Sequence, residues 1–97
     1  MHARKIALRA REGQFERLVG TIRGTLLPAA KRQPGYVGIT MFSDREACRV
    51  VGTTWWRTES DMLAGEASGY LEEQLGHLAP LLSEPPAIER YDAEPRA

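Results

Sequence analysis

The 97-residue chain has little cysteine, no excess of charge of either sign and no long apolar run. Its single cysteine, Cys48, has no second cysteine in the chain with which to form a disulfide. The 13 basic and 13 acidic residues cancel, so no broad basic surface for nucleic acid or anionic membrane is expected. No stretch of 18 apolar residues and no signal peptide is recognised, and we expect a soluble, cytoplasmic protein.

Residues typical of common cofactor sites are also scarce. One interior histidine, His77, and one cysteine do not make a set of metal ligands. The sequence has no phosphate-binding glycine loop, no dinucleotide fingerprint and no Ser-His-Asp arrangement. Nothing near Cys48 in the sequence would lower its pKa and make it a nucleophile. We therefore expect the protein to work without flavin, heme or a bound metal.

Two apolar segments, residues 36–42 and 50–56, are the most informative part of the chain. Both are typical of strands, and neither alternates apolar with polar residues. Side chains of a strand point to opposite faces with period two. One predicted face carries Tyr36, Gly38, Thr40, Phe42, Gly52, Thr54 and Trp56, and the other carries Val37, Ile39, Met41, Val51, Thr53 and Trp55. Both faces are largely apolar, so both need cover.

A second copy of the chain is the simplest cover for one of these faces. A monomer of this length buries only about 60–65% of the surface of its unfolded chain, so an added interface would increase its stability. The helices can cover the other face. The sequence therefore predicts a homodimer through the sheet face that bears Val37, Ile39, Met41, Val51 and Trp55.

The sequence predicts a short first strand at Arg4–Ala10, and a helix follows it. From Gln14 onwards, apolar residues fall on one helical stripe: Phe15, Leu18, Val19, Ile22, Leu26 and Ala29. Pro28 should kink the last turn of this helix. Thr58 can cap a second helix, which Gly65 and the pair Ser68-Gly69 interrupt, and residues 87–92 are typical of a fourth strand.

The resulting order is strand, helix, strand, strand, broken helix, strand. This βαββαβ order predicts a single domain over residues 1–97, of the α+β, ferredoxin-like class with one antiparallel four-stranded sheet.

The order and spacing of several segments resemble the antibiotic biosynthesis monooxygenase (ABM) domains, a branch of the dimeric α+β barrels. The resemblance rests on Gln33-Pro34-Gly35-Tyr36-Val37-Gly38, Trp56-Arg57-Thr58-Glu59-Ser60-Asp61-Met62, Gly69-Tyr70-Leu71, Leu78-Ala79-Pro80-Leu81-Leu82, and Pro85-Pro86 before a strand containing Tyr91. It covers nearly the whole chain. It implies that two sheets pack face to face into a dimeric barrel, with a cavity in each subunit between its own sheet and helices.

The resemblance also implies a chemistry. ABM monooxygenases oxidise polyketide aromatics without metal or flavin, and the Trp that closes their third strand, here Trp56, belongs to the cavity wall. Heme-degrading relatives need an Asn in the first strand, a Trp early in the second helix and a His about three turns along it. Here Ile6 stands in that part of the first strand, no Trp follows Trp56, and His77 lacks those companions. Heme degradation is therefore not expected.

Five residues are candidates for binding a substrate: Trp56, Tyr36, Thr54, Tyr70 and His77. Trp56 could hold a planar ligand and a carbonyl, or it could be a core residue. The hydroxyls of Tyr36 and Tyr70 could donate to a bound oxygen, or the rings could simply pack. His77 could act as a general base near pH 7, although its place outside the leucine stripe also fits a surface histidine. No catalytic residue is assigned.

Two classes of function fit these observations. The first is a cofactor-independent monooxygenase, or a related isomerase or cyclase, that acts on an aromatic or polyketide-like small molecule. The second is a non-catalytic dimer that binds a small ligand or assists another protein. An apolar cavity with few titratable groups fits both classes. The enzyme interpretation requires at least one proton acceptor inside the cavity.

Overall fold

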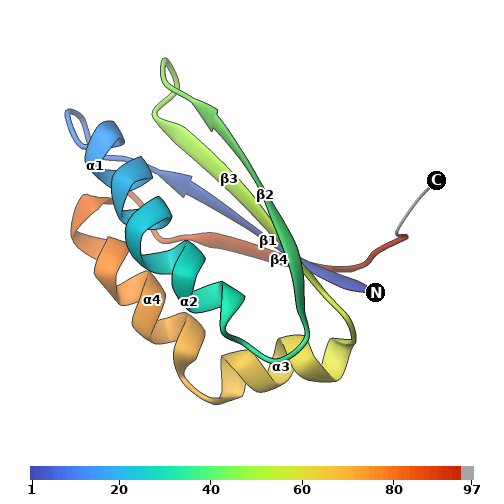
Figure 1. The fold of residues 1–97 in the computed structure, drawn as a ribbon. Helices are drawn as coiled ribbons and strands as arrows, with labels where there is room; N and C mark the ends of the chain where they lie inside the picture. Colours follow the sequence, from blue (N-terminus) through green and yellow to red (C-terminus); the bar gives the residue numbers. More distant parts are fainter. Residues whose placement is uncertain (95–97) are drawn as a thin grey trace.

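Four strands pair into one antiparallel sheet, and this sheet positions the rest of the molecule. The strands are β1 (His2–Arg9), β2 (Tyr36–Asp44), β3 (Arg49–Trp56) and β4 (Ala87–Asp92). Their order in the sheet is β2-β3-β1-β4 (Figure 1). The structure is a computed structural model, and it describes residues 1–94. The predicted α+β, ferredoxin-like arrangement is confirmed.

The helix between β1 and β2 changes its winding along its length. It consists of α1 (Phe15–Thr21), a π-helical segment (Ile22–Leu26) and α2 (Leu27–Lys31). Pro28 has no N–H with which to bond the carbonyl of Gly24, four residues earlier. The chain widens into the π-helical segment just before this proline. The expected disturbance therefore lies upstream of Pro28, and Ile22 and Leu26 both face the sheet.

The second helical region is broken at Ser68-Gly69 as expected, whereas Gly65 lies within an unbroken helix. It consists of α3 (Glu59–Ala67), α4 (Tyr70–Leu78) and a 3₁₀ turn (Ala79–Leu81). The hydroxyl of Thr58 accepts a hydrogen bond from the Asp61 N–H at 3.1 Å, which confirms the predicted N-cap. Gly69 separates the two helices with φ of 85°, a left-handed conformation that glycine adopts at little cost.

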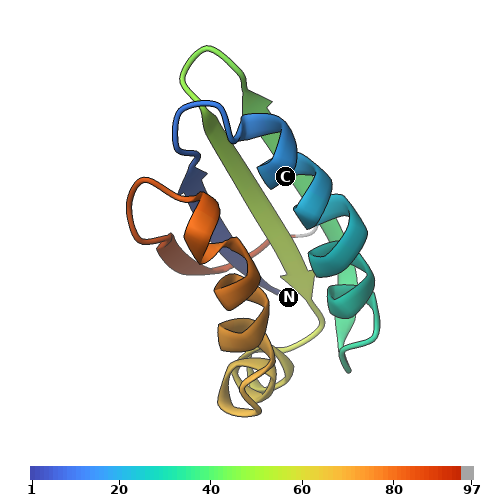
Figure 2. The same ribbon diagram turned by 90° about the vertical axis from the view of Figure 1, so that its left-hand side faces the viewer.

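All the helices lie on one face of the sheet. Figure 2 shows the α1–α2 helix and α4 running side by side across that face. The core lies between the two layers, where Leu8, Leu18, Val50 and Leu78 are almost completely buried. Within residues 1–94, no helix is both long enough and apolar enough to cross a membrane.

A β-bulge at Val37 changes which residues of β2 face the helices. Tyr36 pairs with Trp56, but Gly38 pairs with Trp55, so β2 contains one extra residue between the two pairs. A shift of one residue moves every later side chain of a strand to the opposite face. The faces predicted by simple alternation are therefore wrong for β2 from Gly38 onwards.

This correction moves Ile39 and Met41 from the predicted dimer face to the face under the helices, where both line a cavity. Phe42 moves the other way. It pairs with Val51 on the outer face, and it is 66% exposed. The predicted positions of Val51 and Trp55 on the outer face agree with the pairing, because β3 has no bulge in its ladder with β1.

No helix of residues 1–94 covers the outer face of the sheet, which carries large apolar side chains. These are Phe42, Val51, Trp55 and Tyr91, and Val37, the extra residue of the bulge, is also exposed. Tyr91 is 47% exposed and lies opposite Ala3, on the same face as Trp55. Contiguous apolar surface of this kind commonly marks a protein–protein interface.

Candidate functional site

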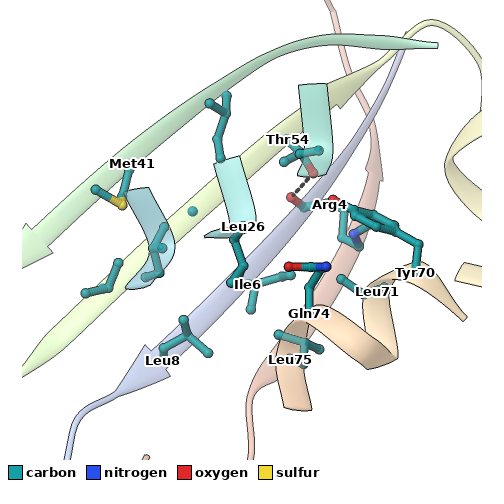
Figure 3. Close-up of a pocket in the computed structure, with 15 residues that line it drawn as sticks. Arg4, Ile6, Leu8, Leu26, Met41, Thr54, Tyr70, Leu71, Gln74 and Leu75 are labelled. Atoms are coloured by element: carbon teal, nitrogen blue, oxygen red, sulfur yellow. Dashed lines mark hydrogen bonds between the residues drawn. The ribbon is translucent and has the colours of Figure 1, made fainter. Parts of the chain in front are cut away.

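A cavity of about 60 Å³ lies between the sheet and the helices (Figure 3). Aliphatic side chains from both layers form most of its wall: Ile6, Leu8, Ile22, Leu26, Met41 and Leu75. One water molecule requires roughly 10–15 Å³ on this scale, so the space corresponds to about four to six water-sized atoms. The cavity can therefore accept about one small ring without rearrangement.

Polar side chains gather at one end of this apolar space. They are Arg4 and Thr54 from the strands and Tyr70 and Gln74 from α4. Figure 3 shows the side chains of Arg4, Tyr70 and Gln74 converging there. The cavity thus combines an apolar body with one polar end, which is the usual design of a small-molecule site.

Arg4 is the charged group of this polar end, and it is only 1% exposed. Its Nη1 donates a hydrogen bond to Oε2 of Glu66 at 3.0 Å. The centre of its guanidinium lies 5.2 Å from the ring centroid of Trp56, within the range of a cation–π interaction. Period-two alternation places Arg4 on the same side of β1 as the core residue Leu8.

Two buried polar atoms at the cavity have no hydrogen-bond partner among the described residues. They are Nε of Arg4 and Oε1 of Gln74. A buried donor or acceptor without a partner costs about 1–3 kcal/mol, and more when the group is charged. A ligand oxygen placed beside Arg4 would remove the cost at its Nε, whereas Oε1 of Gln74 is an acceptor and would need an O–H or N–H of the ligand. The charge of the guanidinium favours a negatively charged oxygen at Arg4.

Glu66 on α3 joins Arg4 to Arg90 on β4. The Nε of Arg90 donates to the two carboxylate oxygens of Glu66 at 3.1 and 3.0 Å, and Arg4 shares one of those oxygens. The hydrogen bonds from Arg90 above all, and those from Arg4, lower the pKa of Glu66, although partial burial acts in the opposite direction. Two guanidinium groups around one carboxylate leave this cluster with a net positive charge.

The lowered pKa of Glu66 makes a testable contribution to stability. Ionised Glu66 stabilises the fold above its usual pKa of 4.5, and this contribution disappears as the pH falls through the lower folded-state value. We expect the free energy of unfolding to decrease between about pH 5 and pH 3, and to decrease less in Glu66→Gln. Urea denaturation at several pH values would measure this. Glu72→Gln, an exposed acid on α4, is the control, and an equal acid response in both variants would contradict the expectation.

Tyr70 lines the cavity with a phenol that can donate a hydrogen bond. Burial raises the pKa of its phenol, and the nearby charge of Arg4 only partly opposes that effect. Tyr70 therefore keeps its proton at neutral pH. It can donate to a bound oxygen, but it cannot accept a proton from a substrate at that pH.

Trp56 lies behind Arg4 and does not line the cavity. Its side chain is fully buried, and its indole N–H donates to the hydroxyl of Thr54 at 3.0 Å. The hydroxyl of Thr54 in turn donates to the backbone carbonyl of Arg4 at 3.4 Å. Tyr36 packs edge-on against Trp56, with 6.1 Å between the ring centroids. Trp56 and Tyr36 thus support the cavity by holding Arg4 in place.

The structure brings together four of the five candidate residues. Thr54 and Tyr70 line the cavity, and Trp56 and Tyr36 form the layer behind it. His77 is exposed on the last turn of α4 and is not part of the wall.

Sequence reasoning missed Arg4 and Gln74. The signal for Arg4 was present, because a charged residue at an inward position of a strand usually has a specific partner or task. Within residues 1–94, no three or more His, Cys, Asp or Glu side chains are grouped so that they could hold a metal ion.

Comparison with known proteins shows what this architecture is. No family model and no curated protein matches the sequence. A candidate antibiotic biosynthesis monooxygenase from Nitrosomonas europaea has a similar structure, with a TM-score of 0.78 and 16% identity over 96% of this chain and 98% of that one. The chain has the ABM fold.

Two further solved structures with this fold carry names that describe a function. A variant of SnoaB, a cofactor-independent oxygenase from Streptomyces nogalater, has a TM-score of 0.77 and 16% identity, over 98% of this chain and 95% of that one. A monooxygenase from Streptomyces coelicolor in complex with nanaomycin D has a TM-score of 0.73 and 20% identity, over 99% of this chain and 89% of that one. At these identities the likeness is one of fold.

Proposed function

We propose that this protein is a cofactor-independent monooxygenase that oxidises a small hydroxylated aromatic molecule held in the cavity as its phenolate. The observation that carries this proposal is the buried guanidinium of Arg4, whose Nε has no partner at the end of an apolar cavity. A phenolate meets both parts of the site, because its ring is apolar and its oxygen carries the charge. The ABM fold, found in oxygenases that need no cofactor, supports the same reading.

The positive charge of Arg4 acts on the ionisation of the substrate. An opposite charge within a few ångströms favours the charged form and lowers the pKa of a bound phenol. Among the described residues that line the cavity, Arg4 and Tyr70 are the titratable groups, and neither accepts a proton at neutral pH. We therefore expect the proton to leave to water, so that the substrate binds as its anion.

The anion is the form that reacts with oxygen. Transfer of one electron from a phenolate to O₂ gives a phenoxyl radical and superoxide, which combine at the ring carbon para to the oxygen. This peroxide anion takes up one proton from water, and the resulting hydroperoxide loses the hydrogen of the same ring carbon together with its outer O–H as one water molecule, which leaves a quinone. One phenol and one O₂ thus give one quinone and one water. The hydrogen bonds of Arg4 and Tyr70 hold the substrate oxygen during these steps, and the aliphatic wall keeps bulk water away.

Isotope labelling tests this proposal directly. Protein dialysed against a metal chelator would be incubated under ¹⁸O₂ with single-ring phenols that have a free para carbon. We expect quinone carrying one labelled oxygen, formed faster than with buffer alone or with Arg4→Met. Binding of phenols without any labelled product would favour the alternative of a non-catalytic binding dimer. The absence of a proton acceptor in the described cavity wall is the observation that favours that alternative.

The proposal includes a homodimer formed by the outer faces of two sheets. The exposed apolar side chains on this face support it, and stable interfaces of this class bury about 1,600 Å² or more. We expect sedimentation to show twice the mass of one chain, and Phe42→Asp to shift the protein towards monomer. Leu63→Asp is a matched control, because Leu63 is also exposed but lies on α3. A monomeric unmodified protein at micromolar concentration would contradict the dimer.

A further inference from the structure

Arg90 lies outside the cavity, yet it shares a carboxylate with the residue that we expect to bind the substrate. We propose that Arg90 determines how strongly the cavity prefers an anion, because it neutralises Glu66 and leaves the charge of Arg4 for the ligand. This inference rests on the proposed function of the cavity. It assigns a positioning and specificity role to a residue that touches neither substrate nor cavity wall.

The side-by-side placement of Arg4 and Arg90 is electrostatically unfavourable without a negative charge between them. Arg4 and Arg90 are direct partners on the neighbouring antiparallel strands β1 and β4. Directly opposite side chains lie on the same face of a sheet, and like charges in such a pair destabilise it. Glu66 bridges them from α3, with one of its oxygens accepting from both. A single carboxylate cannot balance two guanidinium groups, so one positive charge remains.

Arg90 holds the larger share of Glu66. It donates to both carboxylate oxygens, whereas Arg4 donates to one. Its hydrogen bonds are also the main cause of the lowered pKa of Glu66. With Arg90 present, Glu66 is already neutralised, and the uncompensated charge lies at Arg4, beside the cavity. Without Arg90, Arg4 and Glu66 would form a neutral pair, and an incoming anion would compete with Glu66 for the same guanidinium.

Other titratable groups lie around this cluster in the described chain. Two residues from Arg4 on the same face of the sheet, Nε2 of His2 lies 3.0 Å from the carboxylate of Glu59 on α3 and 2.9 Å from that of Asp92 on β4. On α4, Tyr70 lies at the cavity and is neutral, and Glu72 lines a neighbouring hollow of about 450 Å³ together with Glu66. On β2, Tyr36 lies behind Trp56. The side chain of Arg90 itself is 43% exposed, so its removal leaves no buried void. Replacement of Arg90 therefore changes the charge of the cluster with little change in packing.

The test measures the ionisation of 4-nitrophenol bound to the protein, because its phenolate absorbs visible light and it ionises near neutral pH. Absorbance titrations would be compared for the unmodified protein and for Arg90→Gln. We expect roughly threefold to tenfold weaker binding of the phenolate by Arg90→Gln, and a higher pKa of the bound probe by about half to one pH unit. Arg9→Gln is the control, since it also removes one charge from an exposed ion pair, with Glu84.

Two further variants separate charge from structure. Arg90→Lys keeps the charge and should keep the pKa of the bound probe close to that of the unmodified protein. Glu66→Gln removes the negative charge and should shift that pKa in the opposite direction, towards lower pH. A purely structural role of Arg90 would not produce shifts of opposite sign.

Three results would overturn the proposal. They are an unchanged bound pKa in Arg90→Gln, an equal shift in Arg9→Gln, and failure of the unmodified protein to bind the probe. The titration needs no turnover. A protein that shows these shifts but incorporates no labelled oxygen would therefore contradict the monooxygenase and support the role of Arg90.

Discussion

Replacing Arg4 with methionine is expected to weaken the binding of phenolates by about 30-fold to several thousandfold, with little loss of stability. Truncating one member of a buried, hydrogen-bonded charge pair commonly costs 2–5 kcal/mol of binding free energy. The fold should tolerate the change, because methionine fills similar space and Glu66 keeps Arg90 as a partner. We expect the free energy of unfolding to change by less than about 2 kcal/mol in either direction.

Calorimetry with 4-nitrophenolate and urea denaturation of the same preparation would measure both quantities. Arg11→Met is the control for general effects of losing an arginine from this end of the chain. Arg11 donates to the carbonyl of Leu82 at 2.9 Å and does not line the cavity. Undiminished affinity in a folded Arg4→Met protein would remove Arg4 from the binding site.

Replacing Trp56 with alanine is expected to destabilise the protein by about 3–5 kcal/mol, the usual cost of truncating a fully buried tryptophan. Trp56 has no exposed surface, bonds Thr54 and lies against both Tyr36 and the guanidinium of Arg4. The sequence alone left open whether Trp56 holds a ligand or is a core residue. Because the ring is fully buried, we expect the substitution to change the stability of the protein more than its ligand binding.

Urea denaturation of Trp56→Ala and Trp56→Phe would check this expectation. The phenylalanine should recover most of the stability, but not the hydrogen bond to Thr54. Trp55→Ala is a matched control from the same strand, because Trp55 points to the outer face. Trp55→Ala should weaken the association of the dimer more than it lowers the stability of the fold. A loss below about 1 kcal/mol in Trp56→Ala would contradict the supporting role that we give this ring.

Local signals in the sequence were sufficient to predict the order of the elements. Thr58 was recognised as an N-cap because its side chain can accept from the first turn of a helix, and the structure contains that bond. Gly69 was recognised as a break because glycine weakens a helix and adopts positive φ readily. The stretch Ala87–Asp92 was predicted as the last strand with the bounds that the structure shows.

The faces of β2 could not be predicted, because alternation assumes an uninterrupted ladder. The bulge at Val37 adds one residue and reverses every side chain that follows. Gly38 was the available signal, since an isolated glycine within a strand often marks a bulge. This one irregularity exchanged Met41 and Phe42 between the cavity and the outer face.

Of the five candidate residues, Thr54 and Tyr70 line the cavity, Trp56 and Tyr36 lie behind it, and the charged residue Arg4 was missed. Arg4 was missed because candidates were selected by the chemistry of aromatic and imidazole groups, and not by the inward position of a charge. Its partners Glu66 and Arg90 come from α3 and β4, far away in sequence, so only the fold brings them together.

The ionisation of 4-nitrophenol bound to the unmodified protein tests the central claim most directly. Two effects oppose each other in the cavity, because burial in an apolar space raises the pKa of a phenol and a neighbouring guanidinium lowers it. If Arg4 is placed to receive an anionic oxygen, the charge should prevail, and the bound probe should ionise at a pH about one unit or more below that of the free probe. A bound probe that ionises at the same pH as the free one, or at a higher pH, would contradict the account.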